Sequence, residues 1–174
     1  FKKNQKEYER LSDHIGVFPV VMIAPTDQEL ITEGSEIRRK FMDGVISQYD
    51  HHYLEDLIRY NQVLSQRNAL LKQCSAKGII DWHSFAVWDD QLINYGSRIF
   101  KKREEFIKGF EPLFSKLYNF ISGSVDAVSI TYESQLLKSN FHELLQNSHS
   151  RDLDMLYTTT GIHKDDLVFN LKGY

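Results

Sequence analysis

The chain of 174 residues has little of what marks several protein classes. A single cysteine, Cys74, excludes a disulfide framework and is consistent with a reducing cytoplasm. No apolar run approaches the roughly 18 residues of a membrane-spanning helix, and the polar N-terminus lacks the apolar core of a secretory signal. The formal net charge of −3 predicts no strong overall attraction to nucleic acid or anionic lipid.

Short motifs for nucleotide, metal and nucleophile chemistry are also missing. The chain contains no P-loop, no dinucleotide-type glycine loop and no Gly-x-Ser-x-Gly elbow. The histidines follow no zinc spacing, and neighbours on a helix such as His51 and His52 cannot both face one ion. The sequence therefore predicts neither a catalytic residue nor a metal site.

What is present is an ordinary globular composition, with 41% hydrophobic and 26% charged residues. The length suits one domain or part of a larger one. Because the chain lacks an initiator methionine and its last residues have a strand pattern, we expect an excised piece of a longer protein.

Strands are expected before the middle of the chain. Residues 18–24, FPVVMIA, are a continuous apolar run rich in β-branched side chains, which is typical of a buried strand. A proline ends this run, and Thr26 or Asp27 can cap a helical turn through 28–31. A more polar strand is expected over 2–8.

The middle of the chain has the spacing of two long helices. From 35 to about 74, apolar and aromatic residues recur at steps of three, four or seven, which indicates one buried helix face and a length of roughly 60 Å. A second such pattern covers about 85–120, where Pro112 should kink or split the helix. The two helices predict an antiparallel hairpin.

The tip of this hairpin is expected near residues 75–83. Lys77 and Gly78 mark the end of the first helix, and Asp81 or Ser84 can cap the second.

After Gly123 the pattern changes to strands and a short helix. Residues 125–134 alternate between apolar and polar, a helix is expected at about 139–148, and a last strand at 166–171. Strands on both sides of the hairpin predict an α+β fold, in which a mixed α/β base carries an inserted helical arm.

Two kinds of polar group in the helices are open to a functional interpretation. Arg38, Arg39 and Lys40 begin the first helix, and a second basic group spans 101–103; these can contact phosphate or lie on a solvated surface. The stretch 60–72 is unusually polar. Its side chains can form interhelical hydrogen bonds, a partner surface or, more simply, an exposed stripe: Asn61, Gln62, Gln66, Arg67 and Asn68.

The stretch TTTGIHKDDLVF, at 158–169, places His163, Lys164, Asp165 and Asp166 in a row. A metal site, an acid–base pair, a nucleic-acid contact and a solvated turn are all open from these residues alone. Since adjacent strand residues point to opposite faces, the two aspartates are poor candidates for a paired-carboxylate site.

Four segments together resemble RecF, a family of bacterial DNA replication and repair ATPases in the SMC-like ABC group. They are the strand, Pro-x-Asp turn and Arg-Arg helix entry (18–43), the Tyr-Asn…Gln-Arg-Asn-x-Leu-Leu-Lys run (53–72), the Trp-Asp…Gly…Arg pattern (88–107) and the Gly-x-His-x-Asp-Asp-Leu element (161–167). In the last, Ile162 and Lys164 replace the family's usual proline and arginine.

The resemblance implies the central part of a P-loop ABC-type ATPase. Residues 1–34 would end the first ATPase lobe, 35–122 would form the arm, and 123–174 would return to the base. Walker A would precede this segment, and the signature and Walker B would follow it. The segment alone is therefore expected to hold no ATP or Mg and to hydrolyse no ATP.

For the whole protein, the resemblance implies ATP and Mg binding, ATP-dependent homodimerisation and weak DNA-dependent ATP hydrolysis in the bacterial cytoplasm. It also implies binding to single-stranded and gapped duplex DNA, and recombinase loading with RecO- and RecR-type partners in DNA recombination and the SOS response. A stand-alone helical scaffold without nucleotide binding is the alternative.

The resemblance also assigns roles to residues. Asp27 takes the place of a Q-loop residue that couples nucleotide to arm movement, with simple helix capping as the alternative. Arg38 and Arg39 lie at the arm's root and are expected to contact DNA phosphate, with salt bridges to Glu33 or Asp43 as the alternative.

The element His163, Lys164, Asp165 and Asp166 becomes the re-entry from the arm into the ATPase base. One of the two aspartates, with His163 on the same face as Asp165, is expected to face the nucleotide domain or its dimer partner.

Overall fold

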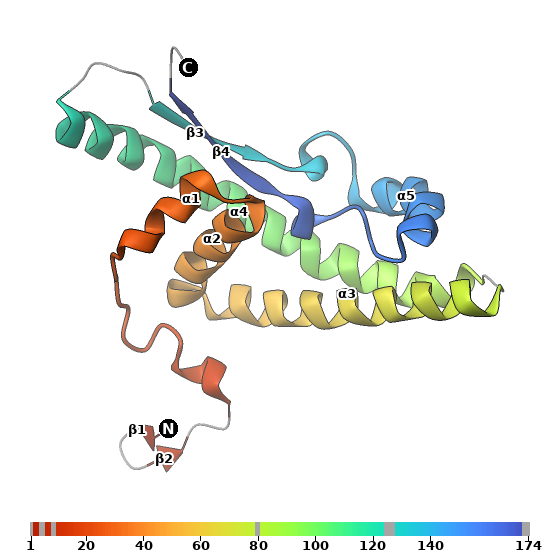
Figure 1. Cartoon of the computed structure of the whole chain (residues 1–174). Helices are drawn as coiled ribbons and strands as arrows, with labels where there is room; N and C mark the ends of the chain where they lie inside the picture. The colour runs from red at the N-terminus through yellow and green to blue at the C-terminus, as the bar shows by residue number, and fades with distance from the viewer. Residues whose placement is uncertain (1, 4–5, 8–9, 79–80, 124–127, 172–174) are drawn as a thin grey trace.

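The molecule is mostly helical, with a small sheet laid across its longest helix (Figure 1). The computed structural model describes residues 2–3, 6–7, 10–78, 81–123 and 128–171. Among these residues, no helix combines the length and apolar character that crossing a membrane requires.

The N-terminal part is an extended strap with little regular structure. Strands β1 (Lys2–Lys3) and β2 (Lys6–Glu7) pair antiparallel, and a 3₁₀-helix, η1 (Leu11–His14), follows. The prediction of one polar strand over 2–8 is therefore wrong, because two short strands satisfy in each other the backbone groups that a lone strand leaves open.

Residues 18–24 form no strand in this structure, so the prediction of a buried strand is wrong here. Val21 and Ile23 are 90% and 88% exposed. A strand needs a neighbour for its backbone groups, and no described strand lies beside this run. It is tied instead through the Val20 backbone N–H, which donates to Gln48 Oε1 at 3.1 Å.

The predicted helical turn after residue 24 is confirmed. It consists of η2 (Pro25–Gln28) followed by α1 (Glu29–Thr32). The Asp27 carboxylate accepts a hydrogen bond from the Ala24 backbone N–H at 2.8 Å. That contact belongs to the start of the turn and is local.

The first long helix is two helices, α2 (Ser35–Tyr49) and α3 (His51–Lys77), so the single helix predicted from 35 to 74 is wrong. Asp50 leaves the helical conformation at φ −124° and ψ 96°. Its carboxylate accepts from the Tyr53 backbone N–H at 3.0 Å, which caps α3. A short polar side chain that bonds the nearby backbone competes with helix continuation, while the apolar spacing passes through the break unchanged.

Helices α3 and α4 (His83–Ser122) form the predicted antiparallel hairpin (Figure 1). Gly78, in the left-handed conformation at φ 64°, ends α3, and Asp81 accepts from the His83 backbone N–H at 3.0 Å. Tyr60, Leu92 and Ile99 are fully buried between the elements. A buried side chain of this size contributes about 1.5–3 kcal/mol.

Pro112 lies inside α4 without splitting it, so of the two predicted outcomes the split is wrong, while the kink stays a prediction. The helix continues on both sides because aromatic packing holds it there. The ring centroids of Phe106 and Phe110 lie 5.2 Å apart, and those of Phe110 and Phe114 lie 6.1 Å apart.

Strands β3 (Val128–Glu133) and β4 (Asp166–Leu171) pair antiparallel, with Ile130 opposite Phe169 and Tyr132 opposite Leu167. Their inner face packs on α4 and α2. The last strand is confirmed at its predicted bounds, whereas positions 125–127 of the other predicted strand lie outside the described residues.

Between the two strands lie η3 (Gln135–Leu137), α5 (Phe141–Met155) and η4 (Ile162–Lys164). Helix α5 is longer than the 139–148 predicted. Its polar second half continues because Asp152 is completely buried against other elements, a tertiary contact that sequence periodicity does not report.

Candidate functional site at the junction of the return segment and the helices

Residues 158–166, here called the return segment, lead from α5 through η4 to β4 and lie against α2, α3 and α4 (Figure 1). Thr158, Ile162 and Asp165 are buried in this segment. Because buried polar groups must find hydrogen-bond partners, the helices supply them through four arginines.

Arg103 on α4 is the centre of the first group, at the arm's root, and is 1% exposed. Its Nη1 donates to the Ile162 carbonyl at 2.7 Å and to Asp165 Oδ2 at 2.9 Å. Its Nη2 donates to both carboxylate oxygens of Asp43 at 2.9 and 3.0 Å. The Tyr53 hydroxyl also bonds Asp43, so one guanidinium joins α2, α3, α4 and the return segment.

Burial raises the pKa of the Asp165 carboxyl above its ordinary value, while the charge of Arg103 acts in the opposite direction. The Tyr132 hydroxyl donates to the same carboxylate oxygen, Oδ2. Asp165 is therefore an internal counter-ion for Arg103. The side chains of His163 and Asp165 are both turned into the helices. That one of the two aspartates faces the nucleotide domain or its dimer partner stays a prediction.

The side chains of Arg38 and Arg39 extend from α2 toward the start of β4. Arg38 makes a two-pronged ion pair with Asp166, with Nε–Oδ1 at 2.7 Å and Nη2–Oδ2 at 3.0 Å, and its Nη1 donates to the Glu33 carbonyl at 2.6 Å. Arg39 Nη1 donates to the backbone carbonyl of Asp165 at 2.6 Å. Arg38 thus meets Glu33 only through its backbone, and the carboxylate that it takes is Asp166.

The ion pair with Arg38 sets the charge of Asp166. Partial burial is the largest single influence and would raise the pKa of this carboxyl. The hydrogen bonds from Arg38 and the Leu167 backbone N–H, together with the charges of Arg38 and Arg39, outweigh it and hold the pKa below its ordinary value. Asp166 is therefore ionised at neutral pH and holds Arg38 in place.

His163 lies between the two ends of the return segment. The Tyr60 hydroxyl is 2.8 Å from Nδ1, and Nε2 is 2.9 Å from the Thr158 carbonyl. A carbonyl only accepts, so Nε2 carries the hydrogen and Nδ1 accepts from Tyr60. Burial lowers the pKa of His163 from 6.5 to about 4, and the imidazole is therefore neutral at pH 7.

Gly161 allows this close approach to α3. Its φ is 120°, a backbone conformation that other residues rarely adopt. A Cβ added there would stand 2.7 Å from the Tyr60 hydroxyl and 2.8 Å from a ring carbon of Phe141. The glycine is required by both conformation and space.

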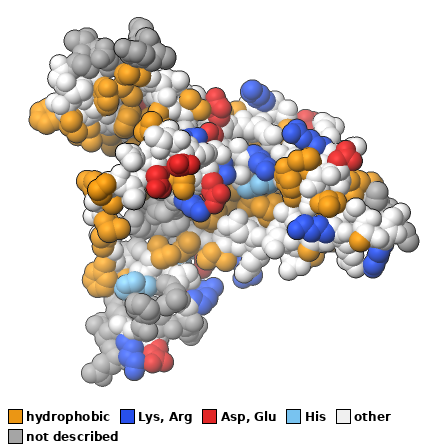
Figure 2. All heavy atoms as spheres, in the orientation of Figure 1, with side chains coloured by type: hydrophobic (Ala, Val, Ile, Leu, Met, Phe, Trp, Pro, Cys, Tyr) orange, Lys and Arg blue, Asp and Glu red, His pale blue; other side chains and the backbone are white. Residues whose placement is uncertain are grey.

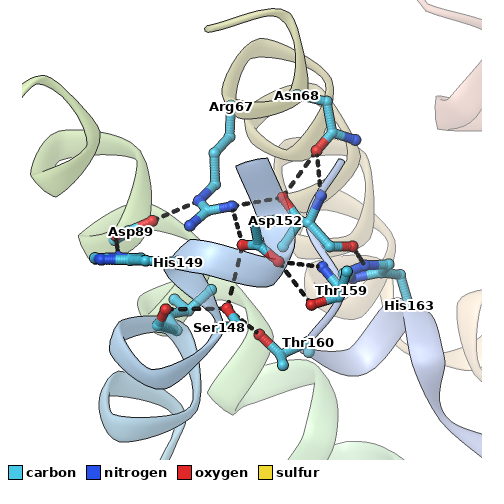
Figure 3. A network of polar contacts seen from close by, with 12 residues as sticks. Arg67, Asn68, Asp89, Ser148, His149, Asp152, Thr159, Thr160 and His163 are labelled. Carbon is cyan, nitrogen blue, oxygen red and sulfur yellow. Dashed lines mark hydrogen bonds and ion pairs between the residues drawn. The ribbon is translucent and has the colours of Figure 1, made fainter. Parts of the chain in front are cut away.

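Arg67 on α3 is the centre of the second group, nearer the hairpin tip (Figure 3). It is fully buried, and its Nε donates to Asp89 Oδ1 on α4 at 2.6 Å. Its Nη1 donates to Asp152 Oδ2 on α5 at 2.6 Å and to the Thr158 hydroxyl at 2.9 Å. Asn68 accepts from the Thr158 backbone N–H at 2.8 Å.

The two buried arginines were missed by sequence reasoning, although a signal was present. The buried residues of α3 include Tyr60, Val63, Arg67, Leu71 and Cys74, at steps of three and four. Arg67 therefore lies on the apolar face. For Arg67, the simpler interpretation of an exposed polar stripe is wrong, and the open alternative of interhelical hydrogen bonds is confirmed. Asn68 is half-buried and bonds Thr158 of the return segment, which lies outside the helices.

Two predicted site residues lie apart from these groups. Asp27 is exposed in η2, and its carboxylate accepts from a backbone N–H of its own turn. Lys164 is exposed, with its Nζ 4.8 Å from the centroid of the Tyr157 ring. The roles predicted for both stay predictions.

The polar groups of the junction hold the return segment against the helices. Across the described ranges, no group of three or more His, Cys, Asp or Glu side chains could hold a metal ion. The carboxylates at the centres are each engaged by a guanidinium, an arrangement that fixes their position.

Comparison with known proteins places the chain among DNA repair proteins. No family model matches it. The curated DNA replication and repair protein RecF of Phocaeicola vulgatus is 48% identical over all 174 residues, which cover 46% of that protein. The RecF of Flavobacterium johnsoniae is 46% identical over 173 residues, 99% of this chain and 48% of that protein. The chain belongs to the RecF family.

Solved RecF structures share the fold. The recombination mediator RecF with ATP, described as part of the RecFOR pathway, is 31% identical and superposes with a TM-score of 0.90, covering 98% of this chain and 48% of that one. The corresponding RecF–ATPrS structure gives a TM-score of 0.89 at the same identity and coverage. The chain thus spans about half the length of the RecF relatives that it matches, and its α+β fold is that of a RecF segment.

Proposed function

We propose that this RecF segment fastens the helical hairpin to the ATPase base of a DNA replication and repair protein, so that movement of one is passed to the other. The observation that carries the proposal is the fixing of one return segment by buried arginines of two helices. A junction of paired buried charges has one favoured geometry, because each unpaired charge would cost several kcal/mol. Such a junction moves as a unit.

For the whole protein, we propose ATP-dependent homodimerisation with Mg, weak DNA-dependent ATP hydrolysis, and binding to gapped DNA. Loading of recombinase with RecO- and RecR-type partners would follow. The relatives are named for DNA replication and repair, and the matching structures carry ATP or ATPrS in their descriptions. The absence of ATP hydrolysis by the segment alone stays a prediction.

We further propose a division between the two predicted DNA-binding arginines. Arg38 commits its guanidinium to Asp166 and to backbone carbonyls, which suits a positioning role. Arg39 donates one hydrogen bond among the described residues, to a carbonyl, which leaves other N–H groups for a ligand. A nucleotide-coupling role for Asp27 remains part of the proposal for the whole protein.

The test replaces Asp166 by Asn in the full-length protein, which removes the charge that holds Arg38. We expect unchanged ATP affinity but a loss of DNA-stimulated ATP hydrolysis of roughly fivefold or more, since coupling free energies are typically 1–3 kcal/mol. Asp56→Asn is the matched control, because Asp56 pairs with Arg98 on the outside of the hairpin. If Asp166→Asn and Asp56→Asn keep equal stimulation by DNA, the junction does not couple the two parts.

A further inference from the structure

We propose that the N-terminal strap positions the helical hairpin through Gln48, in the last turn of α2. Gln48 is thus a positioning residue, which acts through α2 on α3 and α4. The contact is a second connection to the hairpin, separate from the buried arginines. The proposal deepens the proposed function and rests on the use of ATP by the whole protein.

The strap meets Gln48 at two of its residues. The Val20 backbone N–H donates to Gln48 Oε1 at 3.1 Å. Gly16, at φ 82°, lies so close to the end of α2 that an added Cβ would stand 2.3 Å from the Gln48 carbonyl oxygen. Glycine suits this place in both conformation and space. The strap is therefore fitted to the backbone as well as to the side chain of one residue.

The strap is itself ordered at this point. The Val17 backbone N–H donates to the His14 carbonyl at 3.2 Å, and the ring centroids of His14 and Phe18 lie 6.0 Å apart. Farther along, Figure 2 shows hydrophobic side chains open to the solvent on the strap, at the left of the view. Since burial contributes little there, the contacts with Gln48 have a large share in placing the strap.

The end of α2 is joined to the hairpin without a linker. Asp50 closes α2 through its backbone N–H, which donates to the Ile46 carbonyl at 2.9 Å, and opens α3 through its carbonyl, which accepts from the Leu54 N–H at 3.3 Å. One oxygen of its carboxylate caps α3, and the other lies 2.9 Å from Nζ of Lys102 on α4. The turn that contains Gln48 is thus held by both helices of the hairpin.

Neighbouring side chains in this turn divide between the core and the strap. Ile46 and Ser47 are buried, whereas Gln48 is half-buried and bonds the strap. Packed elements shift as units rather than deform, so a displacement of the strap at Gln48 is passed to the hairpin. Asp27, for which nucleotide coupling is predicted, follows Val20 by seven positions on the same strap. Movement at that turn would reach the hairpin by this route.

The experiment follows hydrogen exchange by mass spectrometry in the full-length protein, with and without ATP. Two segments are compared, the strap at 16–24 and the α2–α3 joint at 46–54. In the wild type we expect ATP to change the exchange of both. In Gln48→Leu, which cannot accept from Val20, the strap should still respond. The change at the joint should shrink roughly threefold or more, as expected for one lost hydrogen bond.

Two further variants serve as controls. Gln48→Glu keeps an acceptor oxygen for the Val20 N–H and should keep the wild-type response. Gln66→Leu, the matched control, removes an exposed amide about 24 Å along α3 from Asp50 and should change neither segment. All variants should keep the wild-type melting temperature and ATP affinity, which separates a lost connection from a damaged fold or nucleotide site.

Two results would overturn the proposal: a joint that does not respond to ATP in the wild type, and a joint that responds as fully in Gln48→Leu as in the wild type. Neither concerns the buried arginines, so Asp166→Asn then decides the proposed function separately. If Asp166→Asn keeps its stimulation by DNA while Gln48→Leu loses the joint response, the arginine junction does not couple the two parts and the strap contact stands. A response lost in Gln48→Leu and kept in Gln48→Glu supports the proposal.

Discussion

Arg103 and Arg67 lie on the two helices of the α3–α4 hairpin, and each is buried with two aspartates as partners. Their surroundings differ. All three nitrogens of Arg103 donate to oxygen atoms at 2.7–3.1 Å. Nη2 of Arg67, in contrast, has no hydrogen-bond partner among the described residues, and its guanidinium carbon lies 5.6 Å from the centroid of the Phe85 ring.

The aspartates that pair with the two arginines also differ in how many of their hydrogen bonds come from the arginine. Asp152 keeps hydrogen bonds from the Thr159 backbone N–H and hydroxyl and from Ser148 (Figure 3), whether or not Arg67 is present. Asp43, in contrast, takes three of its contacts from Arg103. At the root, Asp43 therefore depends mainly on one guanidinium, whereas nearer the tip Asp152 is held by a shared network.

The largest expected effect is that of Arg103→Met. The change leaves the buried Asp165 and the partly buried Asp43 without their cation, and breaking a buried pair in this way costs about 3–5 kcal/mol. Urea unfolding of the wild type and the variant measures the difference. Arg98→Met is the control, since the Arg98–Asp56 pair is exposed and should contribute less than about 1 kcal/mol. A loss for Arg103→Met no larger than the control's would contradict the dependence of the root on this residue.

Arg67→Met should cost less, about 2–3 kcal/mol by the same measurement. Asp152 keeps its other donors, and the methionine removes a guanidinium whose Nη2 was already unpaired, so fewer groups lose their partners. The order of the two losses in stability is a sharper test than either value alone. Equal or greater destabilisation than Arg103→Met would show that the shared network does not compensate for the missing guanidinium.

Much of the helical fold could be predicted from the sequence, because its determinants are local. Residues within one turn determine the end of α3 at Gly78 and the cap at Asp81. Strict alternation of apolar and polar residues determines the bounds of β4. The break at Asp50 was missed because the apolar spacing runs through it. Residues 18–24 have the composition of a buried strand, yet pairing with a second strand decides that state, and no described strand supplies it.

The site was less predictable, because its contacts are distant in sequence. Arg103 meets Asp43 across 60 positions, and Arg67 meets Asp152 across 85. A basic residue on an apolar helix face indicates that a carboxylate partner is needed, because a buried charge is costly unless it is paired. The spacing within the helix does not identify which carboxylate that is. The motif around Asp165 and Asp166 was predicted as a re-entry point into the ATPase base, which stays a prediction, and the direction of its side chains depends on these arginines.

The smallest expected effect on stability is that of His163, which lies between the two arginine groups. Its Nε2 bonds the carbonyl of Thr158, a residue that also bonds Arg67, and the residue before it, Ile162, accepts from Arg103. The pKa of His163 is about 4 in the folded chain against 6.5 ordinarily. Between these values the unfolded chain binds the extra proton, so stability is full above pH 6.5 and is lost as pH falls toward 4. The loss from pH 7 to pH 5 should be about 2 kcal/mol.

Urea unfolding at pH 7, 6 and 5 measures this loss, and His163→Gln should remove most of it. Glutamine can still donate to the Thr158 carbonyl and accept from Tyr60, but it does not titrate. His142→Gln, at an exposed position of α5, should leave the pH dependence of the wild type intact. If His163→Gln keeps the full loss between pH 7 and pH 5, the acid sensitivity lies elsewhere, and His163 does not link the two arginine groups through its neutral form.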